Sequence, residues 1–377
     1  MNPNSNILVF ALKCMVMSFY FFSVEAQQAR DILAPVFTLG GSMNPSGYIN
    51  EFGELAVQPI YGETREYLQG RAPYRKKDYW GYLRQPGLKA IEAQFSAVHH
   101  YREGIAAARM GMAVEGGWGY VDSSGLYVIK PKFLIAEDFH EGLAATCLHE
   151  GTIEGVWGFI DKSGKTVIEH QYTVAYDFHY GLARVNKGGL MGGNWGFVDH
   201  TGKQKIPLVY GGLGDFHEGL ASVNLGKAQI SGVGTRWGFM DTTGTIVIPG
   251  KYSEVKDFSE NLAAVKFDGK QGGKWGFINR EDKVVIPGVF KEVTNFCGGV
   301  AAYKENGQWG LIDATGTRIT PPMVDEITFP FTYDLIPVRL DRKWGYINSK
   351  GKWIIDPEFW KAGIFTNPNK EGYELLK

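Results

Sequence analysis

The sequence predicts an all-β tandem repeat array, and three observations support that prediction. The chain has 377 residues, of which 50 are Gly and 14% are aromatic, a composition that combines many turns with large buried rings. A Trp-Gly pair recurs along most of its length. No stretch keeps the 3.6-residue apolar period of a helix without Gly or Pro.

The charge balance excludes one class of partner. Lys and Arg number 39 against 40 Asp and Glu, so the net charge is −1 at pH 7. A protein that binds nucleic acid by neutralising phosphates needs a basic excess on one face. We therefore expect no nucleic-acid partner.

The amino terminus predicts a secretory signal peptide over residues 1–26, followed by an amino-terminal segment over residues 27–45. An apolar run over residues 14–24 follows Lys13, and Val24 and Ala26 place compact residues at its exit. Cleavage after Ala26 would leave the mature chain secreted, periplasmic or on the cell surface. A retained anchor is the alternative, although the run is short for a membrane span, and the mature chain is expected to contain none.

Nine repeat units are predicted over residues 46–377. They start near residues 46, 80, 118, 157, 195, 237, 275, 309 and 344, and Ser46 takes the position that Trp holds in the other eight. Neighbouring units must stack to bury these large side chains. We therefore expect the eight tryptophans to be structural core residues: Trp80, Trp118, Trp157, Trp195, Trp237, Trp275, Trp309 and Trp344.

One part of each unit is constant in length and another part varies. The interval from a Trp to the next strand start of the Leu-Ala type is 25 residues, except that Leu335 follows Trp309 by 26. The remaining variation lies in the connection before the next Trp. This pattern is typical of insertions on a single face of a repeat array.

Three antiparallel strands are predicted in each unit. A Leu-Ala segment forms the first strand, the Trp-Gly segment forms the second, and a third follows a D-x-x-G turn such as Asp161 to Gly164. Segments such as Asp138-Phe139 are assigned to the connection between units. Because units with neighbour-only contacts can extend indefinitely, an open twisted solenoid is predicted, and a closed propeller-like ring is the alternative.

The repeat resembles a known family. Its pattern, K-W-G-F-I-D-x-x-G-K-x-V-I-P-x-Y-x-x-A-x-x-F-x-E-G-L-A, is similar to that of the WG (Trp-Gly) repeat proteins of bacteria, over roughly nine tenths of the mature chain. The resemblance implies a β-rich repeat scaffold and no particular activity. Ser46, and Arg84 in the turn of the second unit, depart from the pattern and suit an amino-terminal cap.

No catalytic motif is present, so a non-enzyme without cofactor is expected. Gly164-Lys165-Thr166 has the ending of a phosphate loop without the earlier Gly or the strand-loop-helix setting. Cys147 lies near His149, but packing explains this pair better than catalysis. Cys147 and Cys297 are too few for a disulfide framework, and the sequence leaves a bridge and two buried thiols both open.

A row of histidines is the most distinctive polar pattern. His140, His179 and His217 occupy one position in three consecutive units, each directly after an Asp-Phe pair. A solvated row of turn residues is the plain interpretation. A metal site is the weaker hypothesis, because the ligand atoms would have to lie about 2.0–2.1 Å from one ion. A pH-sensitive contact surface is a further hypothesis.

The long connections between units are the candidate binding surface. They cover residues 148–156, 186–194, 224–236 and 267–274, and they are rich in Gly. Flexible surface connections are the plain interpretation, and a binding rim is the functional one. The candidate binding residues are Lys187, Asn194, Lys227, Arg236, Lys270 and Lys274.

The leading functional hypothesis is a secreted, monomeric, non-catalytic scaffold that binds a protein or glycan through the edge that carries the long loops. Two alternatives remain. One is a structural envelope component with no specific ligand. The other is a hydrolase-type enzyme in which Asp138, Asp177 and Asp215 converge with the histidines from several repeats.

Overall fold

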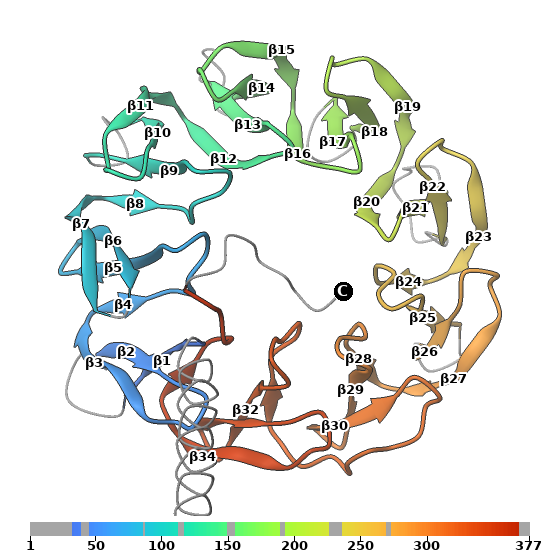
Figure 1. The fold of residues 1–377 in the computed structure, drawn as a ribbon. Coiled ribbons are helices and arrows are strands. Elements are labelled where there is room, and N and C mark those ends of the chain that lie inside the picture. The colour runs from blue at the N-terminus through green and yellow to red at the C-terminus, as the bar shows by residue number, and fades with distance from the viewer. Residues whose placement is uncertain are drawn as a thin grey trace, which may run out of the picture.

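The computed structural model describes residues 32–38, 45–85, 87–111, 117–148, 155–188, 193–225, 236–268 and 273–368. Within these ranges the chain is all-β and contains no helix. Its nine sheets stand side by side around a common axis and close into a nine-bladed β-propeller (Figure 1). The predicted open solenoid is therefore wrong, because the first and last units meet and complete a ring.

The blades are numbered in chain order, and their strands are given from the inner side of the ring outward. Blades 1 to 3 contain β35 (Lys361–Ala362), β1 (Ala34–Phe37), β2 (Ser46–Ile49) and β3 (Leu55–Tyr61); β4 (Glu63–Thr64), β5 (Ala72–Lys76), β6 (Tyr79–Gln85) and β7 (Leu88–Phe95); and β8 (Ala97–Val98), β9 (Ala106–Arg109), β10 (Trp118–Val121) and β11 (Tyr127–Phe133). Blades 4 to 6 contain β12 (Ile135–His140), β13 (Leu143–Leu148), β14 (Val156–Asp161) and β15 (Thr166–Tyr172); β16 (Val174–His179), β17 (Leu182–Lys187), β18 (Asn194–Asp199) and β19 (Gln204–Tyr210); and β20 (Gly212–His217), β21 (Leu220–Asn224), β22 (Trp237–Asp241) and β23 (Ile246–Tyr252). Blades 7 to 9 contain β24 (Glu254–Val255), β25 (Ala263–Phe267), β26 (Lys274–Ile278) and β27 (Val284–Phe290); β28 (Glu292–Val293), β29 (Val300–Glu305) and β30 (Gln308–Asp313); and β31 (Glu326–Ile327), β32 (Ile336–Leu340), β33 (Lys343–Ile347) and β34 (Trp353–Phe359). In blade 8, isolated bridges to Arg318 and Val324 take the place of a regular outer strand.

Blade 1 closes the ring by joining the two ends of the described chain. β1 pairs with β35, Val36 opposite Ala362 and Phe37 opposite Lys361. The inner strand of this blade therefore comes from the carboxyl-terminal part of the chain, and its other three strands come from the amino-terminal part. Because the Trp-Gly segment is the third strand of a blade, every repeat that starts at Trp-Gly continues into the first two strands of the next blade.

The inner strand also corrects the prediction of three strands per unit. The segment around the Asp-Phe pair, which was assigned to a connection, contains this additional inner strand. The strand has six residues in blades 4, 5 and 6, and two residues in each of the other six blades. A register shift between Ala136 and Phe139 interrupts the alternation of side chains in β12. The segment therefore lacks the two-residue period by which a strand is recognised in a sequence.

The Gly of the Trp-Gly pair allows the third and fourth strands to approach closely. A Cβ on Gly158 would lie 2.6 Å from the carbonyl oxygen of Ile168. The pairing register shifts at this position, between Trp157 and Phe159. A residue without a side chain is therefore required there.

The D-x-x-G segments form the tight turns between third and fourth strands. Asp161 Oδ1 accepts hydrogen bonds from the backbone N–H groups of Ser163 at 2.9 Å and Lys165 at 3.1 Å. Gly164 has a φ of 81°, which other residues adopt with strain. These local contacts fix the turn without help from neighbouring blades.

The Glu of the F-x-E-G-L-A part of the repeat connects neighbouring blades. A carboxylate oxygen of Glu103 accepts a hydrogen bond from the N–H of Gly142 at 3.2 Å, and one of Glu141 accepts from Gly181 at 2.9 Å. Both contacts join the turn after one inner strand to the same turn in the next blade. Tyr180 stands at this Glu position in blade 5, so the series is interrupted there.

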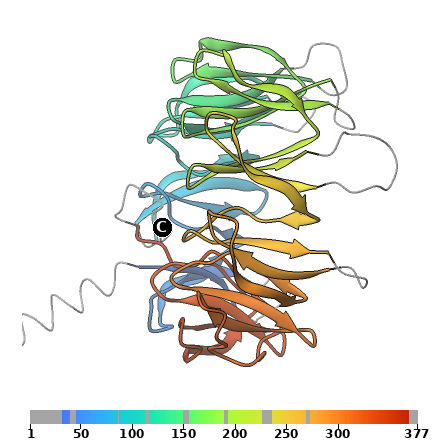
Figure 2. The ribbon, with the colours of Figure 1, turned by 90° about the vertical axis from the view of Figure 1, so that its right-hand side faces the viewer.

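The two faces of the ring carry different connections (Figure 2). Turns between first and second strands and between third and fourth strands lie on one face, here called the turn face. Connections between second and third strands lie on the other, here called the loop face. The latter are two residues long in blades 2, 8 and 9, and six to twelve residues long in blades 3 to 7. The connection between the second and third strands of blade 1 is eight residues long.

Each hydrophobic cluster joins two neighbouring blades. One cluster, for example, places Phe159 and Ile168 of blade 4 against Phe178 and Val185 of blade 5. A single blade therefore cannot bury its own apolar faces, as expected of a repeat architecture. No helix in the described ranges is long and apolar enough to cross a membrane. The predicted signal peptide lies outside those ranges.

Candidate functional site

The inner strands bring the predicted row of histidines together. His140, His179 and His217 are the last residues of β12, β16 and β20. The ring centroids of His140 and His179 lie 5.5 Å apart, and those of His179 and His217 lie 6.5 Å apart. Closure of the ring crowds the inner edges of the blades, so these positions lie closer than the roughly 10 Å spacing of stacked sheets.

Four close polar contacts, of 3.4 Å or less, pass from one blade to the next along this inner edge. Each joins an imidazole or guanidinium to an aspartate of the following blade. The nitrogen-to-oxygen distances are 3.1 Å for His99 and Asp138, 3.3 Å for His140 and Asp177, 2.9 Å for Arg184 and Asp215, and 3.4 Å for His217 and Asp257. These eight residues are called the inner-strand arc below.

Arg184 makes the most extensive contacts of the arc. Its Nε donates to Asp215 Oδ1 at 2.9 Å and its Nη2 donates to Oδ2 at 3.1 Å. The guanidinium also lies 4.0 Å from the ring centroid of Tyr176 and 5.2 Å from that of Trp195. This bidentate and stacked arrangement is one that Lys cannot reproduce. It fixes blade 5 against blade 6.

The electrostatics of the arc favour neutral side chains at its centre. Burial, followed by the charges of Glu137, Asp138 and Asp215, raises the pKa of Asp177 to about 7. Burial lowers the pKa of His140. Although the distance between His140 and Asp177 meets the criterion for an ion pair, both pKa shifts oppose full charge separation.

The nitrogens of the histidine row face carboxylates rather than a common point. His140 Nε2 is directed to Asp177, and His217 Nε2 to Asp257. Among the described residues, no three His, Cys, Asp or Glu side chains form a group that could hold a metal ion. Asp215, which belongs to the hydrolase hypothesis, is engaged by an arginine. The contacts of the arc are those of a seam between blades.

The candidate residues of the long loops fall partly within the described chain. Lys187, Asn194 and Lys274 lie at strand ends on the loop face and are exposed. Arg236 directly precedes β22 and forms an ion pair with Asp268. The two remaining candidates lie outside the described residues: Lys227 and Lys270.

The repeat tryptophans begin or lie near the start of the third strands, at the loop face. Trp80, Trp275 and Trp309 are buried, and the other five are partly exposed. The guanidinium of Arg65 lies 4.1 Å from the ring centroid of Trp80. A Lys or Arg cation also lies within about 6 Å of the ring centroids of Trp118, Trp195, Trp275 and Trp309.

The two cysteines of the described chain are free and buried. Burial raises the pKa of the Cys147 thiol and of the Cys297 thiol. Cys297 Sγ donates to the carbonyl oxygen of Phe331 at 3.4 Å. Both side chains therefore behave as small packed groups rather than as nucleophiles.

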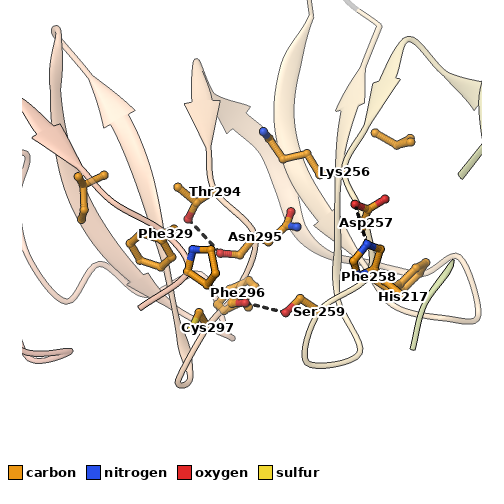
Figure 3. Close-up of a pocket in the computed structure, with 13 residues that line it drawn as sticks. His217, Lys256, Asp257, Phe258, Ser259, Thr294, Asn295, Phe296, Cys297 and Phe329 are labelled. Carbon is orange, nitrogen blue, oxygen red and sulfur yellow. Dashed lines mark hydrogen bonds and ion pairs between the residues drawn. The ribbon is translucent and has the colours of Figure 1, made fainter. Parts of the chain in front are cut away.

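A cavity of about 650 Å³ lies on the inner side of blades 6 to 9 (Figure 3). His217 and Asp257 of the arc form one end of its wall. Sequence reasoning missed three further wall residues, Lys256, Asn295 and Phe329. They follow the two-residue inner strands of blades 7 to 9, where the chain leaves the sheet. One signal was present in the sequence: the interval from Trp309 to Leu335 is one residue longer than in the other units, and this interval contributes to the cavity wall.

Comparison with solved structures supports the fold. The crystal structure of a eukaryotic initiation factor is 11% identical, covers 89% of this chain and 98% of its own, and superposes with a TM-score of 0.60. The β-propeller domain of the trilobed protease from Pyrococcus furiosus is 10% identical, with coverages of 70% and 96% and a TM-score of 0.39. A structure of prolyl endopeptidases is 12% identical, with coverages of 91% and 61% and a TM-score of 0.41. At 11% identity the likeness to the initiation factor concerns the fold alone.

Comparison with protein families gives the identity of the repeat. No curated protein sequence matches the chain. The family described as "WG containing repeat" matches residues 47–80, 118–150, 157–190, 195–227, 237–270, 275–309, 309–344 and 344–369. These stretches make up more than half of the sequence. The chain therefore belongs to the WG repeat family.

Proposed function

We propose that this protein is a secreted, non-catalytic scaffold that binds a protein partner on its loop face. One observation carries the proposal. The connections between second and third strands are long in five consecutive blades, 3 to 7, and all of them leave the same face of the ring (Figure 2). Long connections held by a rigid fold are where proteins commonly place their binding residues.

The breadth of this face favours a protein over a small ligand. Lys187 of blade 5, Arg236 of blade 6 and Lys274 of blade 7 lie at the bases of successive long connections. A surface that spans several blades offers the extended contact area typical of protein complexes.

The inner-strand arc supports the absence of catalysis. Its aspartates already bind a histidine or an arginine of the preceding blade. A carboxylate in such a contact has at most one oxygen left for another partner. Closure of the ring also covers the face of every blade with its neighbour, which supports a monomeric scaffold.

The test compares the mature chain, residues 27–377, with a variant in which four connections are shortened. In that variant residues 149–155, 188–193, 225–236 and 268–273 are each replaced by Asn-Gly, the connection that blade 8 has at Asn306 and Gly307. Both proteins capture partners from envelope and extracellular extract, and each captured protein is then purified and titrated directly. Substitution of Val209 and Val289, exposed on outer strands, provides the control surface.

The expected result is a purified protein that binds the mature chain and the control and loses affinity for the shortened variant. All three chains must unfold at similar temperatures. Equal binding by the shortened variant would exclude the loop face, and no specific binder at all would favour a structural envelope component. Capture of a saccharide in place of a protein would show that the partner is a glycan.

Secretion has its own test. The chain expressed with its first 26 residues is expected outside the cytoplasm with Gln27 as its first residue, by mass spectrometry of the intact protein. A chain retained with residues 1–26 attached to the membrane would indicate an anchor instead.

A further inference from the structure

The cavity on the inner side of blades 6 to 9 has the dimensions of a small-ligand site. Its volume of about 650 Å³ falls within the range of roughly 300–1,000 Å³ that ligand pockets occupy. Its wall is formed where the two-residue inner strands of blades 7, 8 and 9 end. In blade 9 the inner segment is also longer: Leu335 follows Ile327 by eight positions, whereas Val300 follows Val293 by seven. The added length places Phe329 and Pro330 in the wall.

One side of the cavity carries polar groups that lack partners within the described chain. Asn295 Oδ1 is buried and accepts no hydrogen bond from the described residues. The ammonium group of Lys256 forms no ion pair with any described carboxylate, and it lies 5.5 Å from the ring centroid of Trp275. Buried polar atoms are bonded in most proteins, so the amide oxygen of Asn295, a residue of the cavity wall, would gain a partner if its side chain turned toward a ligand that donates to it.

The other polar groups of the wall are acceptors with capacity to spare. The Asp257 carboxylate meets His217 at one oxygen. Ser259 Oγ donates to the carbonyl oxygen of Phe296 at 2.7 Å, which leaves its lone pairs available. Together with Asn295, these side chains present several acceptors and one cation. Such a wall suits a ligand that has several O–H donors and one negative charge.

The opposite side of the cavity is apolar. Figure 3 shows the ring of Phe329 across from Lys256 and Asp257, with Asn295 between them. Phe329 packs edge-on against Phe331, with ring centroids 5.3 Å apart, so the orientation of its ring is fixed. Ile327 and Pro330 continue this apolar side. A ligand held here has one apolar surface and one polar edge.

We propose that this cavity binds a carboxylate-bearing sugar residue of the uronic acid type, with its carboxylate on Lys256, a hydroxyl donating to Asn295 Oδ1 and the C–H face of its ring on Phe329. A sugar ring combines the required features, since its hydroxyls lie at the edge and its C–H groups form a face. A peptide carboxyl terminus offers the charge but only one or two N–H donors. This inference goes beyond the proposed function, because the cavity lies on the inner side of the ring and involves none of the long connections.

The test uses the mature chain and three probes in isothermal titration: trigalacturonate, the neutral galactotriose, and a tripeptide with a free carboxyl terminus. Three variants alter one contact each, Lys256→Met, Asn295→Ala and Phe329→Ala. Lys130→Met, on the exposed outer strand of blade 3, is the matched control. Thermal unfolding of each variant verifies that it is folded.

Trigalacturonate is expected to bind the mature chain and the control, and more tightly than galactotriose. Lys256→Met should remove that preference, and Asn295→Ala and Phe329→Ala should each weaken binding by about tenfold. The proposal is overturned if neither saccharide binds at millimolar concentration, if the tripeptide alone binds, or if folded Lys256→Met keeps the preference. The chain with four shortened connections should bind trigalacturonate normally, so failure of the protein-scaffold proposal would leave this result unchanged.

Discussion

Leu33 and Thr366 exchange two backbone hydrogen bonds of 2.8 Å, although 333 positions separate them. Each amide donates to the carbonyl oxygen of the other residue. Thr366 also accepts a hydrogen bond at its Oγ1 from the N–H of Tyr67 in blade 2, at 3.0 Å. The closure of the ring therefore rests on the main chain and reaches beyond blade 1.

Removal of residues 360–377 should open the ring. Blade 1 would lose its inner strand and the buried side chain of Phe365, so the free energy of unfolding should fall by about 3 kcal/mol or more. Urea unfolding measures the loss. Removal of residues 369–377 alone keeps β35 and Thr366 and should change little. Equal stability of both truncated chains would contradict closure by these strands.

Substitution of Arg184 tests the seam between blades 5 and 6. Arg184→Met keeps the aliphatic part but leaves the partly buried Asp215 without its cation, so we expect a loss of about 1–3 kcal/mol. Adding Asp215→Asn should recover part of it. Lys89→Met is the control: Lys89 faces Glu92 at 3.0 Å, and both residues are exposed, where a pair contributes less than about 1 kcal/mol. Similar losses for Lys89 and Arg184 would indicate that the bidentate contact is unimportant.

Asp177 should make stability depend on pH. Its pKa is about 7 in the folded chain and near 3.8 when unfolded, so the folded chain holds a proton that the unfolded chain has lost between these values. Its contribution to stability is therefore present at low pH and is lost as the pH rises to about 7. Asp177→Asn cannot titrate and should gain stability relative to the native chain between pH 4 and pH 8. Urea unfolding at several pH values measures the difference, and a constant difference would exclude the shifted pKa.

The Trp-Gly pair can be tested within one blade. Gly158→Ala would put a Cβ 2.6 Å from the carbonyl oxygen of Ile168, so we expect a cost of about 1–3 kcal/mol or more. Gly142→Ala meets no atom within 4 Å and should cost about 1 kcal/mol, from its φ of 85° alone. Thermal unfolding of both variants gives the order, and a more damaging Gly142→Ala would reject the close-approach explanation.

The sequence predicted three of the four strand positions because their signals are local. Asp161 and Gly164 fix a turn through contacts within four residues, and Gly158 marks a close approach of adjacent strands. The inner strand carries no such signal. Its alternation is broken between Ala136 and Phe139, and in six blades it has only two residues.

Closure of the ring could not be predicted from the same patterns. Neighbouring blades make similar contacts in an open array and in a ring. The difference is the pairing of Leu33 with Thr366, which no local rule connects. The histidine row was found from its spacing, but its contacts with Asp177 and Asp257 depend on the curvature that closure imposes. The residues of the cavity wall differ from one repeat to the next, so no repeat pattern marks them.

Hydrogen–deuterium exchange of the mature chain, free and saturated with its purified protein partner, tests the central claim most directly. Binding on the loop face predicts slower exchange in residues 149–155, 188–193, 225–236 and 268–273 and at the strand ends beside them. Exchange in the turn-face segments, such as residues 161–164 and 199–202, should stay unchanged. Protection confined to the turn face or to the outer strands would contradict a scaffold that binds through its long connections.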